Sequence, residues 1–240
     1  MNVAIMQPYF FPYLGHFALI AQADLWVVFD LTQYTHKSWM TRNRVLHPSG
    51  GWNYIAVPLA NGSTAIRIHE ARVQDLAATK NSLLGKLSHY RKKAPYYRQV
   101  AALIEQGFAA AAGSDSLVNL NVQTLKATCD YLGLSFHYKL ASAQQYLLPQ
   151  EMGAGDWAPR IAELEGATRY INPLGGRELF EPQQFVSRGI ELKFLDFQGM
   201  QYATGDLVFE PGLSVLDALM WNAPEEVARA LRDYSALVDP

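Results

Sequence analysis

The fold is decided by the stretch Val3-Ala-Ile-Met-Gln-Pro-Tyr-Phe-Phe-Pro-Tyr-Leu-Gly-His-Phe-Ala-Leu-Ile20. It begins as a short apolar run typical of a buried strand, continues as a loop rich in proline and aromatic residues, and takes up helical spacing from Gly15 onward. The first turn of such a helix attracts anions through its unpaired N–H groups and its dipole. The stretch therefore predicts a phosphate site at Gly15 and His16. The alternative is that the aromatic residues only fill the core and that His16 is solvated.

The composition indicates one well-packed globular unit. Half of the 240 residues are hydrophobic, which is ample for a single core. The net charge of −2 argues against a nucleic-acid binder that acts by bulk electrostatics. The single cysteine, Cys129, excludes an intrachain disulfide and a thiolate zinc cage, and it fits a reducing compartment.

The ends and the hydropathy of the chain predict a cytoplasmic location. The first strand is expected by residue 3 with no basic segment before it, so we expect no signal peptide. No apolar run approaches the roughly 18 residues that a membrane span needs. We therefore expect a protein without a membrane span.

The apolar runs predict a Rossmann-like α/β fold, in which a mainly parallel sheet has helices on both faces. The expected strands cover residues 3–8, 25–30, 53–58, 135–141 and 168–172. Residues 65–73 and 190–194 also have strand character, whereas residues 33–44 are polar and aromatic without a period and predict a long functional loop. Asp30 ends an apolar run, which would place it at the carboxyl end of a strand, next to a site.

Helix boundaries are marked by several single residues. Asp75 is expected to cap a helix, and Gly133 is expected to end another, whose apolar face includes Cys129. The last helix should begin after Asn222 and turn Tyr234 inward. We predict a single domain over residues 1–240, with the Rossmann-like core in residues 1–185. Residues 186–240 should form a C-terminal extension of strand and helices at one edge of the sheet.

Five sequence blocks resemble the pattern of the WbqC-like family. They are Gln7-Pro-Tyr-Phe-Phe-Pro-Tyr-Leu-Gly-His16, Trp39-Met-Thr-Arg-Asn-Arg44, Lys93-Ala-Pro-Tyr-Tyr97, Tyr170-Ile-Asn-Pro-Leu-Gly-Gly176 and Phe209-Glu-Pro-Gly-Leu-Ser-Val-Leu-Asp217. Members of that family are found among genes for bacterial surface polysaccharide (O-antigen) synthesis. The resemblance implies a glycine transferase or an amino-sugar acyltransferase.

The opening block is also similar to the His-x-Gly-His signature of nucleotidylyltransferases. In those enzymes both histidines and the helix N-terminus stabilise charge on the α-phosphate. Here Tyr13 stands where the first histidine would be, and a phenol carries no positive charge at neutral pH. The similarity therefore supports the fold more strongly than nucleotidyl transfer.

Two further segments are candidates for binding an anion. Lys37, Arg42 and Arg44 would neutralise charge, with Asn43 fixing the loop or reading a substrate amide and Trp39 stacking on a ring. An exposed basic loop and a buried tryptophan are the alternatives. The second segment follows a strand and consists of Asn172, Gly175, Gly176 and Arg177, where an ordinary Gly-Gly turn is the alternative.

These observations favour a transferase or ligase that acylates an amino sugar or similar amine in surface-polysaccharide synthesis. A non-catalytic module that binds a nucleotide or nucleotide sugar is the second hypothesis. ATP or another nucleotide with Mg²⁺ is the expected cofactor, and no tightly held metal is expected. The proposed catalytic residues are His16, Lys37 and Arg42. The proposed binding residues are Gln7, Pro8, Tyr9, Tyr13, Gly15, Asp30, Trp39, Asn43, Arg44, Asn172, Gly175, Gly176 and Arg177.

Overall fold

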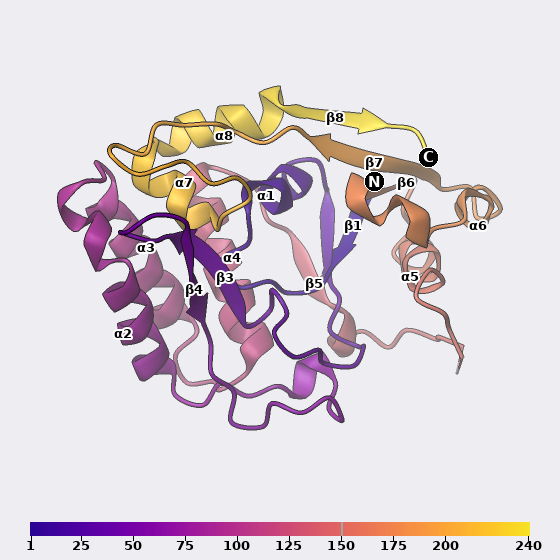
Figure 1. The fold of residues 1–240 in the computed structure, drawn as a ribbon. Coiled ribbons are helices and arrows are strands. Elements are labelled where there is room, and N and C mark those ends of the chain that lie inside the picture. Colours follow the sequence, from indigo (N-terminus) through magenta and orange to yellow (C-terminus); the bar gives the residue numbers. More distant parts are fainter. Residues whose placement is uncertain (150) are drawn as a thin grey trace.

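A computed structural model, which describes residues 1–149 and 151–240, shows a six-stranded sheet, helices around it and a separate two-stranded sheet (Figure 1). The strands are β1 Asn2–Met6, β2 Leu25–Val28, β3 Arg42–Leu46, β4 Trp52–Ala56, β5 Tyr138–Leu140, β6 Arg169–Pro173, β7 Glu191–Phe197 and β8 Ser235–Val238. The α-helices are α1 Leu14–Ile20, α2 Leu76–Lys86, α3 Tyr97–Ala110, α4 Leu117–Leu132, α5 Trp157–Leu164, α6 Pro182–Val186, α7 Val215–Trp221 and α8 Pro224–Asp233. Short 3₁₀ helices are η1 Ile68–Glu70, η2 Ser88–Lys92, η3 Ala141–Ala143 and η4 Leu174–Leu179. Within this described part, no helix combines the length and the apolar character that crossing a membrane requires.

The order of the large sheet is β5-β2-β1-β6-β7-β8, and every neighbouring pair is parallel except β7 with β8. The chain builds outward from β1 through β2 to β5, and then returns to place β6 on the other side of β1. This reversal beside the first strand is the arrangement of Rossmann-like folds, in which ligands bind beyond the carboxyl ends of the strands. The predicted α/β class and the central, parallel position of the first strand are confirmed.

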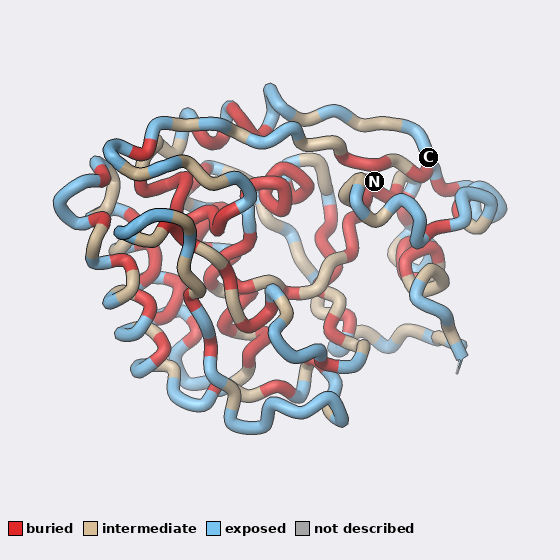
Figure 2. The backbone as a smooth tube through the Cα atoms, in the orientation of Figure 1, coloured by how far each residue is buried: buried red, intermediate tan, exposed pale blue. Residues whose placement is uncertain are grey.

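Alternating side chains of the sheet enter two separate cores. Val3 and Ile5 belong to the core shared with α5 and α6, whereas Ala4 belongs to a larger core shared with α1, α3, α4, α7 and α8. Figure 1 shows these two groups of helices on opposite sides of the central strands, and Figure 2 shows the central strands β1 and β2 as mostly buried. Burial on both faces explains why β1 and β2 are apolar runs with no alternation.

Two strand predictions are wrong. Residues 52–56 do not enter the large sheet but pair antiparallel with Arg42–Leu46. The strand Arg42–Leu46 begins inside residues 33–44, which were predicted as a loop, and ends just beyond them. Gly50 and Gly51 have φ of 103° and 66° and make the reversal between β3 and β4. Residues 65–73 contain the 3₁₀ turn η1 rather than a strand. The β3–β4 hairpin was missed because its outer face carries arginine and aromatic side chains instead of an apolar stripe.

The C-terminal segment joins the sheet as β7 and β8, and the second of these strands was not predicted. Tyr234 ends α8 and is 48% exposed, so its predicted inward position is wrong. The other boundary residues behave as expected. Asp75 accepts a hydrogen bond from the N–H of Ala78, Gly133 ends α4 with φ of 67°, and Cys129 is buried.

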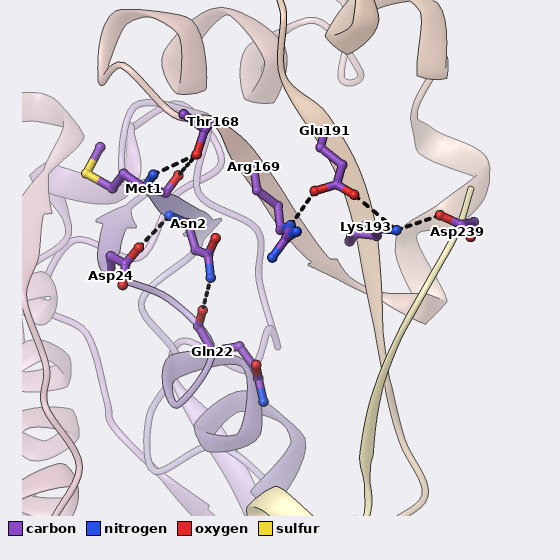
Figure 3. Close-up of polar contacts among 9 residues, drawn as sticks. All are labelled: Met1, Asn2, Gln22, Asp24, Thr168, Arg169, Glu191, Lys193 and Asp239. Atoms are coloured by element: carbon purple, nitrogen blue, oxygen red, sulfur yellow. Dashed lines mark hydrogen bonds and ion pairs between the residues drawn. The ribbon is translucent and has the colours of Figure 1, made fainter.

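Polar contacts hold the amino ends of the strands and the chain termini (Figure 3). The N-terminal amino group donates to Thr168 Oγ1 at 2.6 Å. On the next strands, Glu191 pairs with Arg169 at 2.6 Å and with Lys193 at 3.1 Å, and Lys193 reaches Asp239 at 2.7 Å. These groups are exposed, so each pair stabilises the fold only slightly.

The loop between β1 and α1 is held by its carbonyl groups. Phe11 has a left-handed backbone, with φ of 39°, which is uncommon for a bulky residue. Its carbonyl oxygen accepts hydrogen bonds from Asn43 Nδ2 at 2.9 Å and Ser214 Oγ at 2.7 Å. Asn43 Nδ2 also donates to the Phe10 carbonyl at 3.2 Å. The hairpin and the start of α7 therefore fix the backbone of this loop from two sides.

Helix α4 and the segment before β3 complete this support. Asn121 Nδ2 donates to the carbonyl groups of Pro8 and Met40, both at 2.8 Å. The N–H of Phe10 donates to the Trp39 carbonyl at 2.9 Å. The loop therefore has little freedom, and the side chains that it carries are positioned by segments far away in the sequence.

Replacing Asn43 with alanine should destabilise the protein strongly. The change removes the donor of the buried Phe10 carbonyl and one of the two donors of Phe11, and an unsatisfied buried group costs about 1–3 kcal/mol. Asn53→Ala is the matched control, because Asn53 faces Val45 across the same hairpin and its side chain has no hydrogen bond to the described residues. Urea unfolding of both variants measures the difference, and equal losses in free energy of unfolding would contradict the proposed role of Asn43.

Candidate functional site

A cavity of about 250 Å³ brings together three distant parts of the chain. Its lining residues are Tyr9, Pro12, Tyr13, Trp39, Asn43, Arg44 and Gly212. Five of the residues predicted from the sequence therefore meet in one place, from the loop before α1 and from the segment that enters β3. Gly212 was not predicted, although it lies in the last of the five sequence blocks.

Arg44 supplies the positive charge of this cavity. Its guanidinium carbon lies 5.5 Å from the ring centre of Trp39 and 5.1 Å from that of Trp52. One terminal nitrogen donates to the Gly212 carbonyl at 3.2 Å, whereas the buried Nε has no partner among the described residues. A guanidinium fixed between aromatic rings keeps its planar set of donors oriented for a carboxylate or phosphate.

The hairpin explains why Arg44 points outward and Asn43 inward. Alternate residues of a strand lie on opposite faces, so Arg42 and Arg44 share the outer face while Asn43 faces the core. The guanidinium carbon of Arg42 lies 4.2 Å from the ring centre of Tyr54, and Arg42 does not line the cavity. Lys37 is exposed, with a left-handed φ of 55°, and lies outside the cavity lining as well. Of the three predicted cations, only Arg44 reaches the cavity.

Tyr9 and Tyr13 contribute uncharged side chains to the cavity wall. Burial raises the pKa of both phenols, and the neighbouring Tyr13 raises that of Tyr9 further. At neutral pH both side chains remain protonated and are hydrogen-bond donors. Asn43 also lines the cavity, but its amide group already holds the carbonyl groups of the loop.

The predicted phosphate site over the first turn of α1 is not supported by the geometry. His16 is 1% exposed, with its ring 4.8 Å from that of Trp26 and 5.3 Å from that of Tyr9. Neither ring nitrogen has a partner among the described residues, and burial lowers the pKa of His16 to about 3. A Cβ on Gly15 would lie 2.4 Å from the Tyr13 ring, so that ring covers the turn where the phosphate was expected. The expected cationic imidazole is therefore a neutral core residue.

Asp30 belongs to a different part of the sheet edge. Its carboxylate is buried and accepts hydrogen bonds from the backbone N–H of Ser142 at 2.8 Å and from Ser142 Oγ at 2.6 Å. It lines a separate cavity of about 290 Å³ with His69 and Arg72. The structure therefore does not bring Asp30 together with Arg44.

The remaining predicted residues are not part of the Arg44 cavity. Asn172 accepts a hydrogen bond from the Tyr170 hydroxyl at 3.0 Å and donates one to the Pro173 carbonyl at 3.0 Å. A Cβ on Gly176 would lie 2.3 Å from Asn172 Nδ2, so this glycine makes room for a neighbouring side chain. Gly175, Arg177, Gln7 and Pro8 are also absent from the cavity lining.

A second cavity, of about 600 Å³, adjoins the first and shares Tyr13 and Gly212 with it. Its wall includes Phe197, Tyr202, Phe209 and Glu210, none of which was predicted to form a site. Phe209 and Glu210 lie in the sequence block Phe209–Asp217, and Phe197 and Tyr202 precede it. This block is the sequence feature from which a site here could have been predicted. Asp217 itself is buried behind this wall and accepts hydrogen bonds from the hydroxyl groups of Tyr90 and Tyr202, the latter at 2.6 Å.

The fold and the cavities define an α/β protein with two adjoining cavities beside the first strand–helix junction of a mainly parallel sheet, the place where folds of this class commonly bind ligands. The profile of the WbqC-like protein family matches residues 7–229, and the chain belongs to this family. It is also 28% identical over 233 residues to the uncharacterized protein Rv1507c of Mycobacterium tuberculosis, covering 96% of this chain and 97% of that protein. No solved structure matches the chain.

The burial of His16 predicts a specific loss of stability in acid. Its pKa of about 3 in the folded protein lies below the ordinary value of 6.5, so the unfolded chain takes up a proton first as the pH falls. Stability should therefore be lost below about pH 6.5, by about 1.4 kcal/mol per pH unit from this group, until the pH approaches 3. We expect His16→Gln to remove this contribution to the pH dependence.

Urea unfolding of the wild type and of His16→Gln between pH 4 and pH 8 measures the difference in slope. Identical slopes, or a wild type that gains stability relative to the variant on acidification, would contradict a buried neutral His16.

Proposed function

We propose that the protein transfers an acyl group, such as glycyl, to the amino group of an amino sugar or similar amine in the synthesis of surface polysaccharide. Membership of the WbqC-like family supports the biological setting. The observation that carries the proposal is the Arg44 guanidinium, held between Trp39 and Trp52 at the wall of a cavity with two protonated tyrosines. This arrangement suits the anionic part of an activated carboxylate donor.

The proposed reaction forms an amide. The amine nitrogen attacks the acyl carbonyl carbon, the bond to the leaving group breaks with its electron pair, and the proton lost by the nitrogen passes to the leaving group or to water. Arg44 would hold the negative charge of the leaving group, and the hydroxyl groups of Tyr9 and Tyr13 would donate to oxygen atoms on which charge develops. Trp39 would stack on a planar or ring-shaped part of the donor.

A nucleotide is the proposed activating group, and its position differs from the one expected from the sequence. The Tyr13 ring covers the first turn of α1 and His16 is uncharged, so these residues do not fit a phosphate there. The donor set at Arg44 does fit a phosphate. Mg²⁺ would accompany such a nucleotide through its phosphates.

A non-catalytic binding module is the second candidate function. It is favoured by the state of Tyr9 and Tyr13, the titratable side chains beside Arg44 in the wall of the smaller cavity, because burial keeps both phenols protonated at neutral pH. Neither can act there as a general base. The two candidates differ in turnover and share the same anion site.

Arg44→Gln should weaken anion binding, and Arg42→Gln should not. Hydrogen bonds to charged groups contribute about 1.5–3 kcal/mol, so loss of the Arg44 guanidinium should lower affinity for inorganic pyrophosphate roughly 10- to 150-fold. Arg42 is a matched control because it lies on the same face of the same strand, stacks on Tyr54 and lies outside the cavity. Calorimetric titration of both variants, with thermal melts to confirm folding, measures the effect.

Equal weakening by both substitutions would contradict the assignment to Arg44. Transfer itself is tested with aminoacyl adenylates and amino sugars, with detection of the amide product by mass spectrometry. Binding at Arg44 without product across such a set would favour the binding module.

A further inference from the structure

We propose that the larger cavity, of about 600 Å³, binds a protonated amine, with Glu210 as the residue that selects it. The inference rests on the proposed function, because it assigns a place to the acceptor. It adds a site and a ligand charge that the sequence did not indicate.

The wall of the larger cavity has the composition of an ammonium site. Of its 14 lining residues within the described part of the chain, Glu210 is the one that carries a formal charge at neutral pH. The aromatic rings of Tyr13, Phe197, Tyr202 and Phe209 surround the same space, and those of Tyr202 and Phe209 meet edge to face at 5.0 Å. A carboxylate beside several aromatic faces attracts a cation through charge and through the ring quadrupoles.

Tyr202 is the lining residue whose orientation is fixed by a buried group. Its hydroxyl donates to Asp217 Oδ2 at 2.6 Å, which holds the ring in place at the wall. Asp217 also accepts from the Leu46 N–H at 3.4 Å and from the Tyr90 hydroxyl, so its orientation is fixed. Tyr202 is therefore positioned by a buried group and is not free to rotate toward another acceptor.

Lys93 and Arg44, which lie outside this lining, have other partners. Lys93 pairs with Asp206 at 2.8 Å, outside the lining, and Arg44 donates to the carbonyl of Gly212. Glu210 has no ion pair with the described residues. Its charge is therefore available to a ligand.

The two cavities have opposite charge preferences and meet at Tyr13 and Gly212. An anion at Arg44 and an ammonium group at Glu210 would occupy adjoining cavities that share Tyr13 and Gly212 in their walls. Such a pair of neighbouring sites matches a reaction that joins an activated acid to an amine, because the bound ammonium group can give its extra proton to the Glu210 carboxylate and so become the free amine that attacks.

The test compares ligands that differ only in charge. NMR titrations of the ¹⁵N-labelled protein, without any acyl donor, would use glucosamine against glucose and propylammonium against propanol. We expect the ammonium member of at least one pair to bind at least tenfold more tightly than its neutral partner. Glu210→Gln should abolish this preference and leave the binding of inorganic pyrophosphate unchanged. Glu181→Gln, which removes the same charge from an exposed residue before α6, should retain the preference.

The inference is overturned if neither ammonium ligand is preferred, or if the preference persists in Glu210→Gln. It is also overturned if Glu181→Gln loses the preference equally, because the effect would then be one of net charge. These titrations contain no acyl donor, so they test the amine site without testing transfer. If the separate transfer assay gives no product while the amine preference is intact, the proposed function alone is overturned.

Discussion

The carbonyl group of Phe11 is the point on which the site depends. Its residue has a left-handed backbone, which costs of order 1–3 kcal/mol for a side chain of this size. The conformation persists because two side chains donate hydrogen bonds to the Phe11 carbonyl oxygen. They belong to Asn43, which lies 32 positions later in the chain, and to Ser214, which lies 203 positions later. Folding the strained loop therefore requires the β3–β4 hairpin and the start of α7 to be in place.

The same contacts build the cavity. Asn43 faces inward and holds the loop, while its neighbour Arg44 faces outward and supplies the cation. Ser214 holds the loop from the other side, two residues after Gly212, which closes the cavity wall. In the β3 strand and in the segment before α7, a residue that maintains the fold is thus within two positions of a residue that forms the site. This explains why short sequence blocks far apart in the chain carry structure and chemistry together.

The sequence predicted the features that depend on local spacing. The first strand, the helix after it, the cap at Asp75 and the end of α4 at Gly133 follow from periodicity and from the conformations that single residues favour. The sequence predicted the wrong sheet for β4. Its pairing with β3 depends on the chain reversal at Gly50 and Gly51 and not on apolar content.

Tyr9, Tyr13, Trp39, Asn43 and Arg44 were expected to bind a ligand, and these residues from two of the five sequence blocks line one cavity. That this cavity binds a ligand stays a prediction. The state of His16 could not be predicted, because its pKa is set by burial against Trp26 and Tyr9. Asp30 accepts a hydrogen bond from Ser142, which lies 112 positions later in the chain. Glu210 becomes a candidate binding residue only because aromatic side chains from other segments line the same cavity. Such non-local contacts have no signature in spacing.

A crystal structure of the protein soaked with inorganic pyrophosphate would test the central claim most directly. The sequence indicates three segments as anion sites, and the structure of such a complex would show which of them binds the anion. The account predicts the anion at the guanidinium of Arg44, within reach of the hydroxyl groups of Tyr9 and Tyr13, with the Tyr13 ring still over Gly15. An anion over the first turn of α1 with Tyr13 displaced, or one at Arg177, would contradict it.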